Sequence, residues 1–167
     1  PNMPKTLRRS FDVRRRVPDT PLFLVGTSRG AISAAYIASR LQGPRGPDGL
    51  ILTSSVTRPG GRQGWAQLTT LGADLAAIRI PVLIVGHHDD KCPVSPFADA
   101  ELISQRLVNA PLFIGDDRVG QPSAQIEIYG GDPPQSEPCE ALAAHGYLGV
   151  EERAATLIAD WIIHVKS

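Results

Sequence analysis

The sequence is poor in cysteine, in net charge and in long hydrophobic runs, and each shortage excludes a class of protein. Cys92 and Cys139 are the only cysteines, and they lie too far apart for a two-thiolate metal motif. Lysine and arginine together number 17, as do aspartate and glutamate, so nothing favours nucleic acid or an anionic membrane as a partner. No apolar run approaches the roughly 18 residues of a membrane-spanning helix. The 167 residues are enough for a single domain, and a small neutral substrate is compatible with the charge balance.

Residues 1–20 carry an excess of positive charge, with six of the 17 basic residues in the first 16 positions. A nucleic-acid or phosphate patch would account for such a run, but a solvated helix face accounts for it more simply. Leu7, Phe11 and Val17 supply a narrow apolar stripe for that helix. We therefore expect a basic N-terminal segment with helical character and its arginines in water.

The stretch from Pro21 to Leu41 has the pattern of a strand, a sharp turn and a helix. The run from Leu22 to Val25 is apolar throughout, which is typical of a strand buried on both faces of a parallel sheet. Small apolar residues at helical spacing follow from Ala31 to Leu41, and they allow a helix to lie close to that sheet. Between the two lies Gly26-Thr27-Ser28-Arg29-Gly30, which has the form G-x-S-x-G.

Ser28 occupies the centre of this turn. We expect Gly26 and Gly30 to avoid collisions in the tight reversal, which leaves the Ser28 hydroxyl exposed above the carboxyl end of the strand as a nucleophile. The backbone N–H of Arg29, at the positive end of the helix dipole, would then point at an oxygen held near Ser28. The simpler alternative is that Ser28 only caps the helix.

Strands and helices alternate along the rest of the chain. Further strands are predicted at 49–54, 80–86 and 124–129, and helices at 65–77, 95–107 and 150–165. In the second of these helices, Ser95 is expected as the N-cap and Pro96 at the first helical position. The alternation predicts an α/β fold, a mostly parallel sheet flanked by helices, with the site formed by loops at the carboxyl ends of the strands.

A serine nucleophile needs a base, and four histidines are available. His164 lies in the last turn of the final helix, where a cation is favourable, so we assign it a structural role. His87 and His88 follow the third strand directly and are candidates for lining the site, but the acidic pair after them leaves little reach for a base. His145 lies in the loop before the last helix, on the same carboxyl-end rim as Ser28.

The base in turn needs an acid, and Asp89 and Asp90 end the third strand. Two adjacent carboxylates cannot both orient one imidazole, so the residues alone leave the choice between them open. A metal site built from His87, His88 and Asp90 is an alternative, but these residues lack the ligand spacing of a metal motif. We therefore expect no metal or other cofactor.

The order of these residues resembles that of the α/β-hydrolase superfamily, whose triad runs nucleophile, acid, histidine, as Ser28, Asp90 and His145 do here. In such enzymes the acid typically follows a strand of the form P-V-L-x-x-H-G-x-x-D. Aligning Pro81 to Val85 with that pattern puts Asp90 at the acid, with Asp89 as the fallback. The residues from His87 to Cys92, with Cys139 and His145-Gly146-Tyr147, resemble a bacterial subgroup of these hydrolases with a poorly defined substrate.

The resemblance implies a serine hydrolase acting on a carboxylic ester or a related acyl substrate. Ser28 would attack the acyl carbonyl, His145 would take its proton, and Asp90 would fix the imidazole tautomer. An acyl-enzyme would form, and water would then hydrolyse it. The residues expected to line the site are Thr27, His87, His88, Asp89 and Tyr147.

The resemblance covers the C-terminal half of that fold, from the nucleophile strand onward. The loop that supplies a second oxyanion N–H in complete members is missing here, so Arg29 alone would hold the oxyanion. Losing one such donor elsewhere costs about two to three powers of ten in rate. The strand at 22–25 would also expose an edge through which the chain could self-associate. The alternative function is therefore a noncatalytic remnant or a partner-binding fragment.

Each cysteine lies close in sequence to a member of the expected triad, Cys92 two residues after Asp90 and Cys139 six before His145. If the acid and the base meet, the cysteines are neighbours on one rim, which predicts a Cys92–Cys139 disulfide. Such a bond persists in an oxidising compartment, so we expect export to the periplasm or outside the cell, and a cytoplasmic location if the cysteines are unpaired. The chain opens with Pro1, and the signal peptide is expected upstream.

Overall fold

A computed structural model of the chain describes residues 12–60, 67–111 and 124–166. Its sheet has four strands in the order β1-β2-β3-β4, and every neighbouring pair is parallel. The strands are β1 (Phe23–Thr27), β2 (Gly49–Thr53), β3 (Val82–His87) and β4 (Ala124–Ile128). Each strand lies within two residues of its predicted position, so the expected parallel α/β sheet is confirmed.

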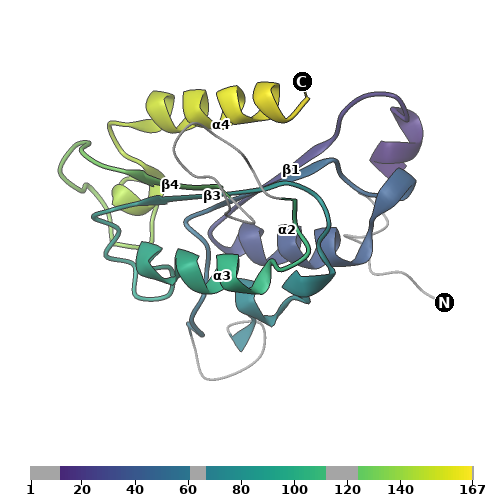
Figure 1. The fold of residues 1–167 in the computed structure, drawn as a ribbon. Coiled ribbons are helices and arrows are strands. Elements are labelled where there is room, and N and C mark those ends of the chain that lie inside the picture. Colours follow the sequence, from purple (N-terminus) through teal and green to yellow (C-terminus); the bar gives the residue numbers. More distant parts are fainter. Residues whose placement is uncertain (1–11, 61–66, 112–123, 167) are drawn as a thin grey trace.

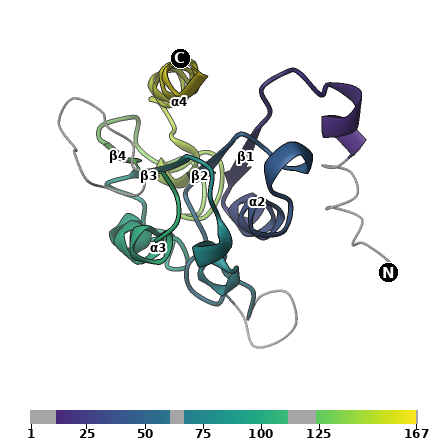
Figure 2. The ribbon, with the colours of Figure 1, turned by 45° about the vertical axis from the view of Figure 1, so that its right-hand side comes forward.

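Helices cover both faces of this sheet (Figures 1 and 2). α2 (Arg29–Arg40) and α3 (Ala100–Arg106) lie against one face, and α4 (Glu151–Lys166) lies against the other. β2 and β3 are buried along their whole length, because their side chains alternate between the two layers. Leu50 and Leu52 pack in the core beneath α2 and α3, whereas Ile51 packs in the core beneath α4.

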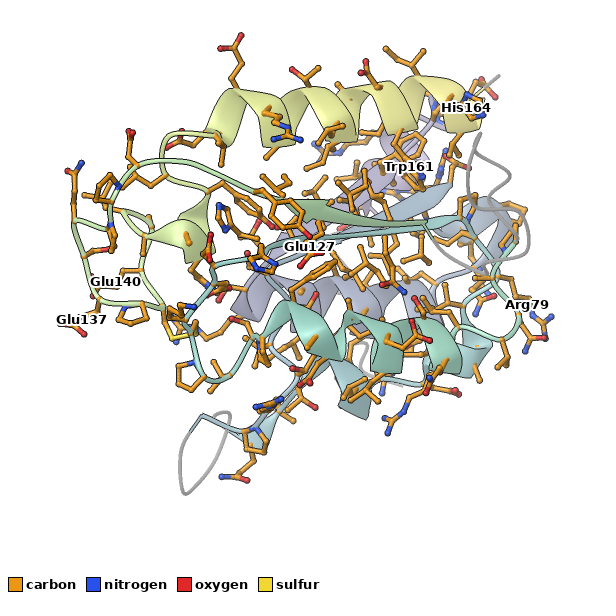
Figure 3. The ribbon with its side chains drawn as sticks, turned by 60° about the vertical axis from the view of Figure 1, so that its left-hand side comes forward. Arg79, Glu127, Glu137, Glu140, Trp161 and His164 are labelled. Carbon is orange, nitrogen blue, oxygen red and sulfur yellow. A yellow bond between two sulfur atoms is a disulfide. The ribbon has the colours of Figure 1, made fainter. Side chains whose placement is uncertain are left out.

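Each helix packs through a surface that its sequence supplies. α2 buries four alanines in the core, which lets the helix axis approach the sheet closely. Trp161 projects from α4 toward the sheet (Figure 3), and its ring meets that of Phe23 edge-on with the centroids 6.1 Å apart. This contact fastens the C-terminal helix over β1, the strand that leads into the serine turn.

The predicted helix at 65–77 is wrong for the residues that the structure describes there. Between residues 67 and 77 the helical structure is limited to short 3₁₀ turns, including Thr70–Gly72 and Leu75–Ala77. The two threonines at 69 and 70 and Gly72 disfavour a continuous helix, and the Thr70 N–H donates instead to the Val56 carbonyl at 2.7 Å. Leu75 still reaches the core, so apolar spacing misled the prediction.

Arg14 corrects the expectation that the N-terminal arginines face water. Residues 12–16 are helical, but the Arg14 side chain is buried and donates from Nε to the Gly46 carbonyl at 3.0 Å. Its guanidinium also pairs with Asp48, which accepts the Leu22 N–H at 2.7 Å. Arg14 therefore ties this segment to the starts of β1 and β2. The expected apolar positions Leu7 and Phe11 lie outside the described residues.

β1 lies at an edge of the sheet, and among the described strands it pairs with β2 alone. Val25 on this strand is 56% exposed, so the expectation that this strand is buried on both faces is wrong. Unpaired strand edges with apolar side chains favour association with another chain. The self-association expected of this edge stays a prediction, which sedimentation of the purified chain at several concentrations would check.

No described helix is long and apolar enough to cross a membrane.

Candidate active site

Ser28 is held in a strained backbone conformation between β1 and α2, with φ 52° and ψ −119°. Residues other than glycine rarely adopt a positive φ, and such strain gathers at functional sites. The Ser28 N–H donates to the Thr53 carbonyl at 2.9 Å, which fixes the turn against β2. The side chain makes no capping hydrogen bond to α2. The helix-cap explanation of this serine therefore fails.

The two glycines of the motif differ in what the fold demands of them. A Cβ on Gly26 would lie 2.6 Å from the Gly30 carbonyl oxygen and 2.8 Å from the Ala31 Cα, whereas a Cβ on Gly30 would meet nothing within 4 Å. The expectation that both glycines relieve a collision is right for Gly26 and wrong for Gly30. Only Gly26 lets β1 pass this close to the start of α2.

Alanine substitutions should separate these two positions. Gly26→Ala should lower the free energy of unfolding by about 1 to 3 kcal/mol, because the new methyl group overlaps backbone that cannot move aside. Gly30→Ala is the matched control, and in a helix it should leave stability unchanged or raise it by up to about 1 kcal/mol. Urea denaturation followed by circular dichroism measures both. Equal midpoints for the two variants would contradict the close packing at Gly26.

The structure brings Asp90 and His145 together at the carboxyl end of the sheet. Asp90 follows β3, and His145 lies in the 3₁₀ turn Ala144–Gly146. His145 Nδ1 is 2.9 Å from Asp90 Oδ2, and the two side chains are 5% and 1% exposed. The other carboxylate oxygen, Oδ1, accepts the Cys92 N–H at 2.8 Å. Both carboxylate oxygens therefore have partners, which fixes the plane of the group against the imidazole.

The tautomer of His145 follows from this contact. A carboxylate has only acceptors, so Nδ1 at 2.9 Å must carry the proton that it shares with Asp90 Oδ2. In the neutral form of this ring Nε2 is then the unprotonated nitrogen, and it is buried without a hydrogen-bond partner among the described residues. Ser28 Oγ does not reach it in this structure. An acceptor held without a partner is what a proton-abstracting base requires.

Two side chains that sequence reasoning did not connect hold the backbone around His145. Ser54 Oγ donates to the His145 carbonyl at 2.8 Å and lies 3.1 Å from the Tyr147 hydroxyl. That hydroxyl donates to the Val85 carbonyl at 3.1 Å. Burial is the main cause that raises the pKa of Tyr147 above its ordinary value, so the phenol stays a donor. Tyr147, expected to line the site, therefore supports the loop that carries His145 through these hydrogen bonds.

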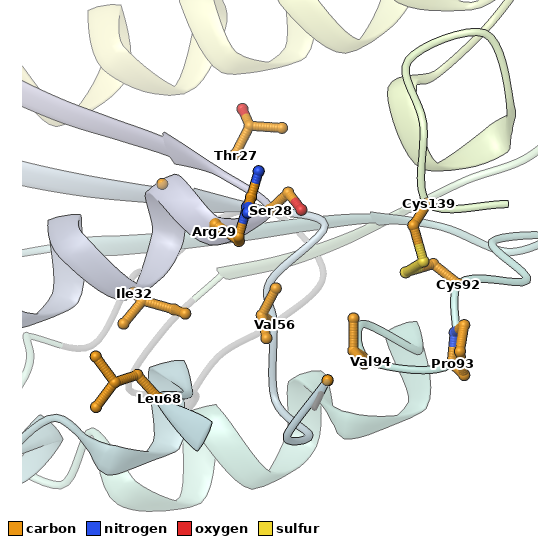
Figure 4. Close-up of a pocket in the computed structure, with 12 residues that line it drawn as sticks. Thr27, Ser28, Arg29, Ile32, Val56, Leu68, Cys92, Pro93, Val94 and Cys139 are labelled. Atoms are coloured by element: carbon orange, nitrogen blue, oxygen red, sulfur yellow. A yellow bond between two sulfur atoms is a disulfide. The ribbon is translucent and has the colours of Figure 1, made fainter. Parts of the chain in front are cut away.

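A cavity of about 700 Å³ opens beside Ser28 (Figure 4). The Ser28 hydroxyl turns toward the side where Cys92 and Cys139 lie. The wall is mostly apolar and is made by Thr27, Ser28, Arg29, Gly30, Ile32, Val56, Gly60, Leu68, Cys92, Pro93, Val94 and Cys139. Arg29 is the one charged side chain in that set, so the cavity suits a neutral or anionic molecule with apolar groups.

The expected disulfide is present, and it forms part of this wall. Cys92 and Cys139 are bonded, with their Cα atoms 4.7 Å apart, within the range that a bridge requires. The bond joins the loop that carries Asp90 to the loop that leads to His145. In a chain-entropy model, closing a loop of this length stabilises the folded state by about 4 kcal/mol.

A second set of contacts braces the loop after β2, which carries Val56 and Gly60 into the cavity wall. The Arg58 guanidinium donates to both carboxylate oxygens of Asp99 at 2.9 Å, and Thr57 Oγ1 donates to Oδ2 at 2.7 Å. The hydrogen bond from Arg58 is the main cause that holds the pKa of Asp99 below its ordinary value. Asp99 is therefore ionised at neutral pH and anchors this loop.

The structure places the other predicted residues away from the Ser28 cavity, except Thr27, which lines it. His87 Nδ1 accepts the Asp89 N–H at 3.0 Å, and Nε2 lies 2.8 Å from the Gly130 carbonyl. His87 and Asp89 line a separate cavity of about 420 Å³. His88 lies at the surface, 2.8 Å from Glu127 and stacked on Tyr129. His164 lies at the C-terminal end of α4 (Figure 3).

These positions argue against the alternative metal site. Backbone groups occupy both ring nitrogens of His87, so this residue cannot join His88 and Asp90 around an ion. Asp90, Cys92 and His145 do offer ligand atoms within 4.8 Å of one another. The Cys92 sulfur belongs to the disulfide, which leaves two donors where a protein metal site normally has three or four.

Comparison with known proteins gives structural likeness only. No family model and no curated protein matches the sequence. Among solved structures, the chain is similar to the non-heme bromoperoxidase BpoC of Mycobacterium tuberculosis, with a TM-score of 0.58 and 14% identity over 96% of this chain and 74% of that one. It is also similar to a protein named as a YdeN-like hydrolase from Pectobacterium atrosepticum, with a TM-score of 0.45 and 18% identity over 77% of this chain. The chain spans 58% of the length of the YdeN-like protein.

Proposed function

Because the chain has the α/β-hydrolase fold, we propose that it is a serine hydrolase that cleaves a carboxylic ester or a related acyl substrate. The observation that carries the proposal is the conformation of Ser28. A strained serine with φ 52° stands on a strand-to-helix turn, faces a cavity of about 700 Å³ and makes no capping bond to explain it. That arrangement is typical of a nucleophile at the top of an α/β-hydrolase sheet.

The proposed reaction uses three side chains in the roles that their chemistry allows. Ser28 Oγ attacks the acyl carbonyl carbon while His145 Nε2 accepts its proton, and the same imidazolium then protonates the leaving alcohol. Asp90 keeps the proton on Nδ1 and stabilises the charged ring. Water attacks the resulting ester of Ser28 with His145 again as the base, which regenerates the free hydroxyl and releases the acid.

The mechanism also needs a donor for the oxyanion and a close approach of His145 to Ser28. The Arg29 backbone N–H, at the first residue of α2, would donate to the oxyanion with the helix dipole behind it. His145 Nε2 and Ser28 Oγ must meet when substrate binds, and catalytic hydrogen bonds of this kind often tighten only in the substrate complex. The apolar wall formed by Ile32, Val56 and Leu68 favours an acyl group without charge.

Turnover of p-nitrophenyl esters tests the proposal. The purified chain should release p-nitrophenol from short-chain and medium-chain esters, with a burst of about one equivalent if the acyl-enzyme accumulates. A noncatalytic, partner-binding chain is the alternative, and the exposed edge of β1 is the observation in its favour. Absence of both turnover and burst across the ester series would contradict the hydrolase and favour the binding role.

The disulfide supports a proposal on location. A Cys92–Cys139 bond persists where the environment is oxidising, so we propose that the protein is exported to the periplasm or outside the cell. Thiol counting on denatured, nonreduced protein from such a compartment should find no free thiol. Two free thiols would contradict the bond and would remove the argument for export.

A further inference from the structure

Ser95 lies beside Asp90 and His145 although its sequence suggests another role. Its Oγ is 3.1 Å from His145 Nδ1 and 3.3 Å from Asp90 Oδ2, and the residue is 2% exposed. The sequence predicts Ser95 as a helix N-cap and Pro96 as the first helical residue, and both predictions are wrong. The 3₁₀ turn Phe97–Asp99 begins after Pro96 without a side-chain cap, and α3 begins only at Ala100.

The loop geometry explains how this hydroxyl reaches the pair. The Ser95 N–H donates to the Cys92 carbonyl at 3.2 Å, and the Cys92 N–H donates to Asp90 Oδ1 at 2.8 Å. One tight turn therefore carries the carboxylate, the half-cystine and the serine. The turn is closed on its far side by the disulfide to Cys139. Ser95 is placed against the acid by its own backbone, without help from α3.

Donors and acceptors assign the protons in this cluster. His145 Nδ1 carries a proton because it faces the Asp90 carboxylate at 2.9 Å, so it cannot accept one from Ser95. The Ser95 O–H therefore donates to Asp90 Oδ2, and a lone pair of Ser95 Oγ faces the Nδ1–H. Asp90 then accepts three hydrogen bonds, from Cys92, His145 and Ser95, which together fix the orientation of its carboxylate.

We infer that Ser95 is a positioning residue for His145. Its hydroxyl holds the Asp90 carboxylate in the plane that meets Nδ1, and its oxygen gives the Nδ1–H a second acceptor. Both contacts favour the tautomer with the proton on Nδ1, which leaves Nε2 as the base. The inference rests on the proposed function for its catalytic meaning, but the tautomer can be observed without any turnover.

Long-range ¹H–¹⁵N spectra of ¹⁵N-labelled protein test the tautomer directly, at a pH where the imidazoles are neutral. His145 should show a protonated Nδ1 with a slowly exchanging, low-field proton, and its signals are identified by their loss in His145→Gln. His87 is an internal reference of the opposite kind. Its Nδ1 accepts the Asp89 N–H and its Nε2 faces the Gly130 carbonyl, so it should carry its proton on Nε2.

Three variants then separate positioning from packing. Ser95→Ala should mix the His145 tautomers and lose the slow Nδ1–H signal, while the His87 signals stay unchanged. Ser95→Thr keeps the hydroxyl and should restore the wild-type pattern. Ser55→Ala is the matched control, because Ser55 is another buried serine and lines the same small cavity as Ser95. The Ser55 hydroxyl has no hydrogen-bond partner among the described residues. An unaltered His145 spectrum in folded Ser95→Ala would overturn the inference.

Inactivation by a fluorophosphonate supplies the catalytic readout. The rate for Ser95→Ala should fall about ten- to a hundredfold, as expected for a lost hydrogen bond to a charged group, and Ser95→Thr should recover most of it. If wild-type protein does not react at all, the proposed function fails, and the tautomer spectra still decide the role of Ser95. An inactivation rate in Ser95→Ala equal to that of wild type would overturn the positioning role.

Discussion

Replacing Ser28 with alanine should abolish p-nitrophenyl ester turnover, a loss of about three to six powers of ten. The hydroxyl is the atom that would bond to the acyl carbon, and no neighbouring group can take its place. The substitution should leave the fold intact, because the Ser28 side chain makes no capping bond to α2 and alanine keeps a Cβ at the same strained backbone position. Initial rates and far-ultraviolet circular dichroism measure the two effects separately.

Ser39→Ala is a suitable control for this variant. Ser39 lies near the other end of α2, where its hydroxyl donates to the Tyr36 carbonyl at 3.1 Å, so its loss should leave the rate unchanged. His145→Ala should be as severe as Ser28→Ala, since residues that act as one catalytic unit are not additive. Turnover that survives in Ser28→Ala would move the nucleophile elsewhere.

Replacing Asp90 with asparagine should lower the acylation rate by about four powers of ten. Asp90 Oδ1 accepts the Cys92 N–H, so the amide oxygen of an asparagine would take that place and its NH₂ would face His145 Nδ1. The ring would then accept at Nδ1 and carry its proton on Nε2. In that tautomer Nε2 has no free lone pair to accept the Ser28 proton. Pre-steady-state release of p-nitrophenol measures the acylation rate.

Asp89→Asn is the matched control for this effect. Asp89 is exposed and lines the other cavity, and its described hydrogen bond is the one from its backbone N–H to His87. Its substitution should therefore change the rate little. If instead Asp89→Asn were the severe variant and Asp90→Asn the mild one, the acid would be Asp89.

Local patterns in the sequence predict those parts of the fold that depend on neighbours in the chain. Continuous apolar runs located β1, β2 and β3, and an alternating pattern located β4 at the edge of the sheet. The G-x-S-x-G pattern located the turn at Ser28. The order of Ser28, Asp90 and His145 led to the disulfide, because the pairing of the last two residues forces Cys92 and Cys139 onto one rim.

Contacts between distant parts of the chain account for what the sequence did not predict. Ser54 donates to the carbonyl of His145, a residue 91 positions away, and Ser95 meets His145 across 50 positions. Arg14 sits in a run of basic residues, yet its acceptor at Gly46 lies 32 positions along the chain. The spacing of residues within a single helix or strand does not indicate such pairs. From the sequence alone, Ser95 is therefore interpreted as a helix cap and Arg14 as a solvated charge.

Mapping of a fluorophosphonate adduct tests the central claim most directly. The probe phosphonylates an activated serine, so reaction with the intact, disulfide-bonded chain followed by peptide mass spectrometry reports the nucleophile without any choice of substrate. We expect one adduct per chain, on Ser28, and none after denaturation. An unmodified chain, or an adduct on any other residue, would contradict the assignment of this protein as a serine hydrolase acting through Ser28.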